Sequence, residues 1–465
     1  MKINLLGKSV VQLRELIKKK EISAKEVFDY FKKRIKRFNR QLNVFLTEAE
    51  YKENKNINGE LSGIPLAVKD NYCTEEIRTT ASSKVLDDFI PPYESTVTQR
   101  LINAGYLLLG KTNMDAWAHG SSTETSDYGP TKNPWDLTRS PGGSSGGSAA
   151  AVSSYLSPAA IGSETAGSIR QPAAWSGIVG LKPTYGRVSR YGVIAMGSSL
   201  DCPGPLTLTV EDAAIILKEI AGNDPFDATS SPKPVEDYSK YLGTKKKYKI
   251  GIADEYFDGL DKDVKKEFLN SIDVVRKMGY EIKKINLIHP KYAISDYTII
   301  QRAEVSSNLA RYDGIRYGHH RTSFAFEAKR RSMLGAYTLS YGYYDAYYKK
   351  AQKLRTLIIE DFKKIFKEVD LIATPTTPIT AIKLGEFVKY PFFGELMDKL
   401  AEPSSMAGIP GINIPIGFDR NNLPIGMQIM GNYFEEKEIL NFAYQFEKET
   451  DFFGVIKKGI NNYKD

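Results

Sequence analysis

The sequence has few cysteines and no long apolar run. Its 465 residues include only Cys73 and Cys202, which are too few and too far apart for a disulfide framework or a cysteine-based zinc site. No apolar stretch approaches the roughly 20 residues that a membrane-spanning helix needs, and the first residues lack the apolar core of a signal peptide. We therefore expect a cytoplasmic protein with no membrane association and no metal site.

Histidine is also scarce, which weighs against the commonest serine-hydrolase chemistry. Residues Gly142 to Gly146 match G-x-S-x-G, the nucleophile elbow of α/β-hydrolases, which would make Ser144 the nucleophile and require a later histidine base. Only His289, His319 and His320 follow, and nothing around them marks a catalytic base. The elbow interpretation is therefore disfavoured.

A second short motif is discounted on its surroundings. Gly105 to Thr112, GYLLLGKT, fits the phosphate-loop pattern G-x-x-x-x-G-K-[ST]. That loop needs exposed backbone around the phosphates, whereas Tyr106 to Leu109 is a continuous apolar run typical of a buried strand. We do not expect a nucleotide site here.

Serine and glycine are concentrated in residues 139–176, which hold ten serines. Two glycine-rich turns, Gly142 to Gly147 and Ala166 to Ser168, each run into a stretch that can start a helix. Such a turn leaves backbone N–H groups unpaired and directed at one point, which suits phosphate binding or stabilisation of an oxyanion. A flexible linker would have a similar composition, but the alanines after the first turn favour a helix. Ser144 and Ser168 are then candidates for a nucleophile and its neighbour.

The net charge of +8 is concentrated near the N-terminus. Residues 1–60 hold fifteen Lys or Arg and eight Asp or Glu. They are expected to form two helices, Val10 to Lys20 and Ser23 to Asn39, the second opened by a Ser-x-x-Glu capping box. A basic run of this kind is usually a solvated face and less often a patch for nucleic acid or an acidic partner. We divide the chain into a basic helical segment, residues 1–60, packed on a catalytic α/β domain, residues 61–465.

From residue 43 onward, short apolar runs alternate with amphipathic stretches. The expected strands are Ile64 to Val68, Tyr106 to Leu109, Ile178 to Leu181, Ile250 to Ile252, Ile282 to Leu287 and Leu371 to Ala373, with a hairpin of Ile412 to Ile416 and Leu423 to Met430. The expected helices are Ser95 to Ala104, Val210 to Ile220, Asp263 to Lys277, Glu304 to Arg316 and Tyr343 to Phe366. The alternation predicts an α/β fold in which a mixed β-sheet lies between helical layers.

Without a histidine base, lysine is the natural substitute. A lysine amine acts as a base only when it is neutral, so its pKa must be lowered by burial. Lys69 follows the apolar strand Ile64 to Val68 and is placed for this role, although a lysine at a strand end is more commonly a surface residue. Ser144, between this lysine and a second serine, would relay the proton.

Three motifs carry a resemblance to a known family: GIPLAVKDN around Lys69, SPGGSSGGSAAAV around Ser144 and GSETAGSIRQPA around Ser168. Together they resemble the amidase signature family. The resemblance implies the amidase signature fold, with catalytic motifs between residues 63 and 205, and a Ser-cisSer-Lys triad. Carried over residue by residue, Ser168 is the acyl-forming nucleophile, Ser144 the bridging serine in a cis peptide bond, and Lys69 the base.

The same resemblance implies an oxyanion hole made by backbone N–H groups of Thr165, Ala166, Gly167 and Ser168. The family's usual spelling before the nucleophile is Asp-Thr-Gly-Gly-Ser, whereas this chain has Glu164-Thr165-Ala166-Gly167-Ser168. If the first glycine normally has a positive φ, Ala166 costs about 1 kcal/mol at that position. The geometry of the oxyanion hole is therefore a point for the structure to test.

Further stretches, among them LGKTNMDAWAHGSSTETSDYGPTKNPWD and MAGIPGINIPIG, resemble the family of glutamyl-tRNA(Gln) amidotransferase A subunits over nearly the whole chain. Members hydrolyse glutamine and pass ammonia to a partner subunit, which amidates activated Glu-tRNA(Gln) or, in some organisms, Asp-tRNA(Asn). The resemblance implies that Tyr297, Arg331 and Asp398 hold glutamine. A free amino acid needs a cation for its carboxylate and an anion for its ammonium group.

The resemblance also implies partners and cofactors. The partners would be a B subunit, which acts as the kinase and amidating subunit, and a small C subunit, so that the three chains form a heterotrimer. The present chain would need no cofactor, since ATP and Mg are expected in the partner, which would also make most of the tRNA contacts.

Three functions account for parts of this pattern. The first is the glutaminase subunit of a tRNA-dependent amidotransferase. The second is a free-standing amidase acting on small or lipid amides, which would share the triad but have no reason to bring Arg331 and Asp398 into the pocket. The third is a non-catalytic tRNA-binding module that acts through residues 1–60, which does not account for Lys69, Ser144 and Ser168. The first is favoured.

Overall fold

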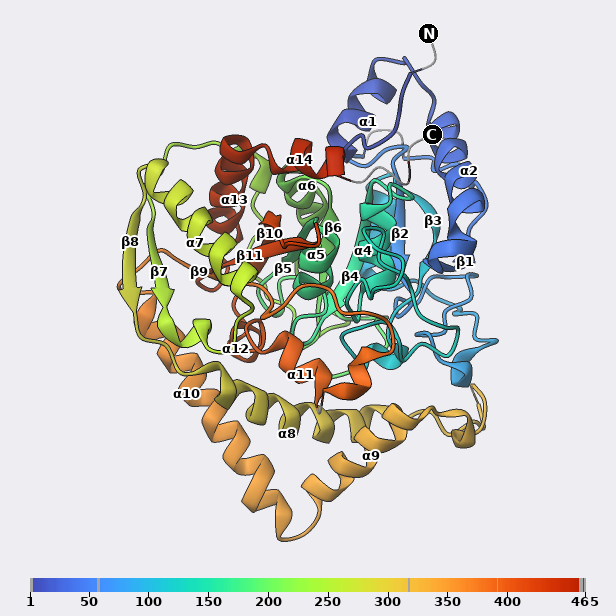
Figure 1. Cartoon of the computed structure of the whole chain (residues 1–465). Coiled ribbons are helices and arrows are strands. Elements are labelled where there is room, and N and C mark those ends of the chain that lie inside the picture. Colours follow the sequence, from blue (N-terminus) through green and yellow to red (C-terminus); the bar gives the residue numbers. More distant parts are fainter. Residues whose placement is uncertain (1–2, 57–58, 317, 391, 460–462, 464–465) are drawn as a thin grey trace.

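A computed structural model describes residues 3–56, 59–316, 318–390, 392–459 and 463. Its centre is an eleven-stranded sheet with the order β1-β3-β2-β4-β6-β5-β10-β11-β9-β7-β8 (Figure 1). The strands are β1 (Phe45–Glu48), β2 (Pro65–Lys69), β3 (Leu107–Thr112), β4 (Ala159–Glu164), β5 (Val179–Lys182), β6 (Cys202–Thr207), β7 (Lys249–Ala253), β8 (Glu281–Ile285), β9 (Leu371–Pro375), β10 (Gly411–Phe418) and β11 (Pro424–Gly431).

Helices surround this sheet (Figure 1). The α-helices are α1 (Val10–Lys18), α2 (Ala24–Leu42), α3 (Thr96–Asn103), α4 (Gly146–Ser153), α5 (Arg170–Ser176), α6 (Val210–Ile220), α7 (Lys262–Lys277), α8 (Pro290–Leu309), α9 (Phe326–Leu339), α10 (Lys349–Ile365), α11 (Phe393–Asp398), α12 (Glu402–Ala407), α13 (Glu436–Thr450) and α14 (Phe452–Gly459). Short turns of 3₁₀ or π helix join several of them. The predicted α/β class, with a mixed sheet between helices, is confirmed.

The sheet is parallel near both ends and antiparallel in the middle. Strands β3, β2 and β4 are mutually parallel, as are β9, β7 and β8, whereas β4-β6-β5-β10-β11-β9 alternate in direction. Every residue of β2, β4, β5 and β6 is buried, because helices cover both faces of the central strands. The carboxyl ends of β2, β3 and β4 lie at one edge of the sheet, and polar residues meet there.

The N-terminal helices are tied to the body by specific contacts. The second helix starts with the predicted capping box of Ser23 and Glu26. The first is anchored at its N-terminus by the buried Asp212 carboxylate, which accepts hydrogen bonds from the N–H groups of Val10 at 3.1 Å and Val11 at 3.0 Å. An anion at this end also complements the helix dipole.

One predicted helix, Glu304 to Arg316, is wrong at both ends. Helix α8 begins at Pro290, where the His289 side chain caps the N-terminus, and it ends at Leu309. Proline suits the first turn because its missing N–H has no helical partner there. Beyond the helix the chain turns, and Gly314 has a φ of +73° that an α-helix does not contain.

The prediction left out strands β1, β4 and β6 and helices α9, α11, α12, α13 and α14. Prolines normally argue against a central strand, and β6 contains Pro203 and Pro205. These two residues lie opposite Ser163 and Ile161 of β4, and β5 pairs with β6 only at Leu206 and Thr207. The missing N–H groups therefore remove no bond to β5. Helix α9 packs with α8, and α9 and α10 form a V-shaped hairpin that projects from the body (Figure 1).

Candidate active site

Lys69 is the last residue of β2 and is completely buried. Its Nζ atom lies 2.8 Å from Ser144 Oγ, 3.0 Å from Ser163 Oγ and 3.1 Å from the Ser163 carbonyl oxygen. Burial lowers the pKa of Lys69 to about 7, and the negative charges of Asp115, Asp201 and Glu164 oppose this shift. The amine is therefore partly neutral near pH 7, as a general base requires.

Ser144 lies on a tight loop before α4. The peptide bond between Gly143 and Ser144 is cis, as the resemblance implies. Gly143 packs so closely on Asp115 that a Cβ there would lie 2.1 Å from Asp115 Oδ2, and its N–H donates to Gln171 Oε1 at 2.8 Å. No larger residue than glycine fits this position, and the loop directs Ser144 toward Lys69.

Ser168 lies between β4 and α5 and is 4% exposed. Its carbonyl accepts a hydrogen bond from the Ser145 N–H at 3.1 Å, which brings the two serine loops together. Among the described residues, no hydrogen bond joins the Ser144 and Ser168 hydroxyls. The N–H groups of residues 165–168 have no protein acceptor within this part of the chain. These N–H groups are therefore available as donors to an oxyanion.

The expected strain at Ala166 is absent, because Ala166 does not have a positive φ. Its carbonyl accepts hydrogen bonds from Ser405 Oγ at 2.6 Å and Arg170 Nη2 at 3.1 Å. Glu164, which stands where the family usually has aspartate, also has an evident role. Its carboxylate accepts from the N–H groups of Ile169 and Arg170, each at 3.0 Å, and forms a fully buried ion pair with the Arg170 guanidinium.

The three residues implied for glutamine binding are buried and come from three helices: Tyr297 from α8, Arg331 from α9 and Asp398 from α11. Asp398 lies against the nucleophile loop, since a Cβ on Gly167 would be 2.3 Å from Asp398 Oδ1. Burial raises the pKa of Tyr297 well above its usual value, and the charges of Arg331 and Asp398 both act on it. The structure thus places Asp398 beside the loop that carries Ser168, while Tyr297 and Arg331 lie on α8 and α9, which pack against each other.

Their hydrogen bonds leave capacity for a ligand. Asp398 Oδ2 accepts from Ser121 Oγ at 2.8 Å, while the buried Oδ1 atom has no partner among the described residues. Burial raises the pKa of Asp398 well above its usual range, and an ammonium group bound at Oδ1 would favour its charged form. Arg331 donates from Nε to Glu327 at 2.6 Å.

Sequence reasoning missed Ser163, Asp115 and Ser121. Asp115 accepts from the N–H groups of Ser122 and Thr123 at 3.2 and 2.9 Å, while its own N–H donates to the Ser144 carbonyl. The buried Asp115 therefore shapes the loop that carries Ser144. A single acidic residue in a polar stretch gives no local signal of this role.

The discounted motifs are explained by the fold. Residues 107–112 form β3, not a phosphate loop. The histidines after Ser144 lie on the surface: His289 caps α8 and lies 3.7 Å from Asp258, and His319 lies 3.5 Å from Asp88. Neither contacts a triad residue.

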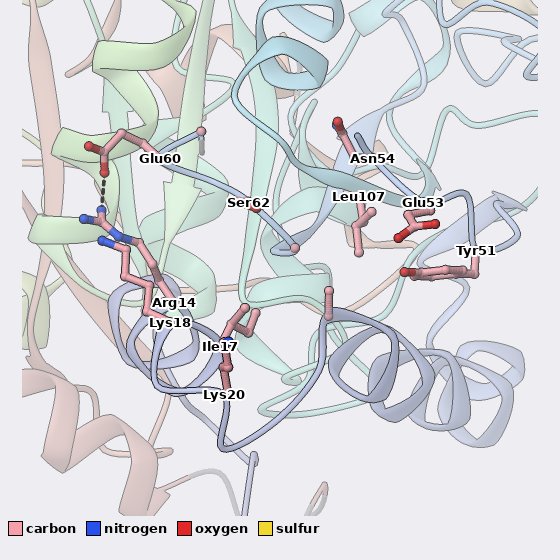
Figure 2. Close-up of a pocket in the computed structure, with 13 residues that line it drawn as sticks. Arg14, Ile17, Lys18, Lys20, Tyr51, Glu53, Asn54, Glu60, Ser62 and Leu107 are labelled. Carbon is pink, nitrogen blue, oxygen red and sulfur yellow. Dashed lines mark ion pairs between the residues drawn. The ribbon is translucent and has the colours of Figure 1, made fainter. Parts of the chain in front are cut away.

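A surface pocket near the N-terminus is separate from this site (Figure 2). It is lined by α1, by Lys20, Ala24 and Leu107, and by residues within 51–54 and 59–63. Arg14 forms an ion pair with Glu60 at 2.5 Å in this pocket (Figure 2). It contains both acidic and basic groups and no member of the triad. Within the described residues, no cluster of three or more His, Cys, Asp or Glu side chains could hold a metal ion. In the same part of the chain, no helix has the length and apolarity needed to cross a bilayer.

Comparison with known proteins agrees with this geometry. The family model described as Amidase matches residues 26–440. The glutamyl-tRNA(Gln) amidotransferase A subunit of Persephonella marina is 49% identical, covering 97% of this chain and 99% of that protein. The A subunit of Halothermothrix orenii is 48% identical, with 96% and 98% covered. The crystal structure of the A subunit from Thermotoga maritima superposes with a TM-score of 0.84 at 38% identity, covering 96% of each chain. The chain therefore belongs to the amidase family and, within it, to the glutamyl-tRNA(Gln) amidotransferase A subunits.

Proposed function

We propose that this chain hydrolyses the side-chain amide of glutamine and supplies the ammonia to a partner subunit that converts Glu-tRNA(Gln) to Gln-tRNA(Gln). The observation that carries the proposal is the 2.8 Å contact between Lys69 Nζ and Ser144 Oγ, with the pKa of Lys69 lowered to about 7 by burial. Placed beside Ser168, this pair is a route for removing the proton of a serine nucleophile.

The chemistry follows from the contacts. Ser168 Oγ attacks the amide carbon while its proton passes to Ser144, after rotation of the Ser168 side chain, and the Ser144 proton passes to Lys69. The carbonyl oxygen becomes an oxyanion that accepts hydrogen bonds from the N–H groups of residues 165–168. Lys69 then returns a proton through Ser144 to the leaving nitrogen, ammonia departs, and water hydrolyses the glutamyl ester on Ser168.

The amino-acid end of glutamine supplies the specificity. Arg331 binds the α-carboxylate, the free Oδ1 of Asp398 binds the α-ammonium group, and Tyr297 supplies a hydroxyl or a ring wall. Each charge-assisted hydrogen bond contributes about 1.5–3 kcal/mol. The triad alone does not distinguish glutamine from any other primary amide, so these three residues separate this function from that of a general amidase.

The ammonia acceptor belongs to other chains. We propose that an amidating B subunit, which uses ATP and Mg and makes most of the tRNA contacts, and a small C subunit join this chain in a cytoplasmic complex. The names of the relatives, which designate one subunit of a tRNA-dependent enzyme, support this assembly.

The test is to measure ammonia release from glutamine, and amidation of Glu-tRNA(Gln), by the chain alone and by the complex. Ser168→Ala should abolish glutamine hydrolysis, because the nucleophile is gone, and should leave amidation with added ammonium intact, because that step occurs in the partner. Loss of the ammonium-supported reaction in a folded Ser168→Ala complex would contradict this division of labour. Equal hydrolysis of glutamine and simple amides by the wild-type complex would favour a general amidase.

A further inference from the structure

Ser163 lies in β4, is 6% exposed and contacts Lys69 with two different atoms. Its hydroxyl oxygen accepts a hydrogen bond from Lys69 Nζ at 3.0 Å, and its carbonyl oxygen accepts a second from the same atom at 3.1 Å. Asn71 Nδ2 donates to the same hydroxyl oxygen at 2.9 Å. The Ser163 hydroxyl is thus held on both sides, by a lysine and by an amide.

The contact between Lys69 and Ser163 determines where the lone pair of the neutral Lys69 amine points. A neutral amine has two N–H bonds and one lone pair. If the two N–H bonds of Lys69 point to the Ser163 hydroxyl and carbonyl oxygens, the lone pair is left facing Ser144 Oγ, the third neighbour. In that orientation Lys69 can accept the Ser144 proton without rotating first.

The charged groups around Lys69 do not provide this orientation. Asp115, Asp201 and Glu164 act on its charge from the end of β4 and from two loops, but none forms an ion pair with Nζ within the described residues. Glu164 is paired with Arg170, Asp201 Oδ1 accepts from Thr165 Oγ1 at 2.7 Å, and Asp115 binds backbone N–H groups. Among the residues that the structure describes, the hydrogen-bond partners of Lys69 Nζ are serine oxygens alone.

We propose that Ser163, held by Asn71, is a positioning residue that fixes the neutral Lys69 amine with its lone pair directed at Ser144. This inference deepens the proposed function, since it rests on the same triad. Ser163 does not contact the reacting atoms and acts only through Lys69.

The experiment measures the reaction of Ser168 with a fluorophosphonate, followed by mass spectrometry of the intact protein across a range of pH. In this step a P–O bond to Ser168 forms, the P–F bond breaks, fluoride leaves, and the Ser168 proton passes through Ser144 to Lys69. The readout reports nucleophile activation and does not require glutamine as substrate. A wild-type protein that reacts with the probe but does not hydrolyse glutamine would refute the proposed function and leave this test valid.

We expect Ser163→Ala to lower the high-pH rate by about tenfold, because the amine loses one of its two fixed acceptors. The rate of Ser168 labelling rises with pH, and this rising limb should also move to lower pH, by about half to one unit. A hydrogen-bond acceptor favours the charged amine, so its removal lowers the pKa of Lys69. Ser163→Thr, which keeps the hydroxyl, should restore both the rate and the limb.

Ser153→Ala is the matched control. Ser153 is a buried serine in α4 whose hydroxyl donates to the Ser176 carbonyl at 2.7 Å and does not contact Lys69. The proposal would be overturned if the rising limb of the labelling rate stays at the wild-type pH in Ser163→Ala. It would also be overturned if the limb shifts equally in Ser153→Ala. If Ser163→Ala does not fold, Ser163→Cys provides the same test, because a thiol of similar size is only a weak acceptor.

Discussion

Lys69 is the last residue of β2 and Lys111 the last but one of β3, the neighbouring parallel strand. Both lysines are fully buried, yet they have different surroundings. Burial lowers the pKa of each. Lys111 Nζ donates to the Tyr72 carbonyl at 2.5 Å and Thr79 Oγ1 at 2.7 Å, and lies 3.9 Å from Asp70. Lys69 Nζ has no carboxylate partner in the described part of the chain and faces the Ser144 hydroxyl. Burial alone therefore does not make a lysine a base, because the base also needs a neighbour that can give it a proton.

The largest expected effect is the loss of the Lys69 amine. Lys69→Ala should lower kcat for glutamine hydrolysis by about three to four orders of magnitude, the upper range for a general base. Lys69→Arg should not restore the rate, since a guanidinium stays protonated. Steady-state assays of folded variants measure this effect, and a substantially active Arg variant would place the base elsewhere.

Replacing Lys111 should affect stability strongly and catalysis little, the opposite of replacing Lys69. Lys111→Met removes a buried cation and its hydrogen bonds, and we expect the free energy of unfolding to fall by about 3 kcal/mol while the folded enzyme keeps kcat within about tenfold. Burial already raises the pKa of Asp70 and Lys111 opposes that shift, so Asp70 in the variant takes up a proton more readily. The stability deficit should therefore be larger at high pH than at low pH.

Chemical denaturation at several pH values, with parallel glutaminase assays, checks the Lys111 prediction. A Lys111→Met protein that is as stable as wild type but inactive would contradict the assignment of Lys111 to a structural role and of Lys69 to a catalytic one.

A smaller effect on activity is expected from the residues proposed to bind the amino-acid end of glutamine, because they bind the substrate and do not react with it. Arg331→Ala should lower kcat/KM for glutamine by about one to two orders of magnitude, and it should leave the slow hydrolysis of an amide without an α-carboxylate nearly unchanged. Asp398→Ala should act in the same way for the α-ammonium group. The measured quantity is the ratio of kcat/KM for the two substrates.

Arg330→Ala serves as the control for Arg331. Arg330 is the adjacent residue and also pairs with Glu327, at 2.8 Å, but its side chain is 33% exposed. The Arg330→Ala variant should leave the ratio of kcat/KM for the two substrates at the wild-type value. A ratio that stays constant in Arg331→Ala and Asp398→Ala would mean that these residues do not bind the amino-acid end.

The sequence predicted much of this site because its chemistry is concentrated in short segments. The apolar strand before Lys69 and the two serine turns are local patterns, and the helix Val210 to Ile220 and the C-terminal hairpin follow directly from periodicity. Tyr297, Arg331 and Asp398 were implied only by resemblance, since no local pattern marks them.

Other features depend on pairing between distant residues. Ser163 meets Lys69 because β2 and β4 are adjacent and parallel, a contact across 94 positions of sequence. The register that lets two prolines occupy β6 is equally non-local, and local propensity does not contain this information. The start of α8 is different, because His289 and Pro290 are a local helix-start signal that the prediction of a helix from Glu304 did not use.

The most direct test of the account is the pH dependence of kcat for glutamine hydrolysis by the wild-type enzyme. Lys69 is protonated below its pKa and neutral above it, so activity should be lost as the pH falls through about 7. We expect the plot of kcat against pH to show a single rising limb centred near 7, which keeps its position in Lys111→Met. A rate that is constant across this range would show that no neutral lysine takes part and would contradict the account.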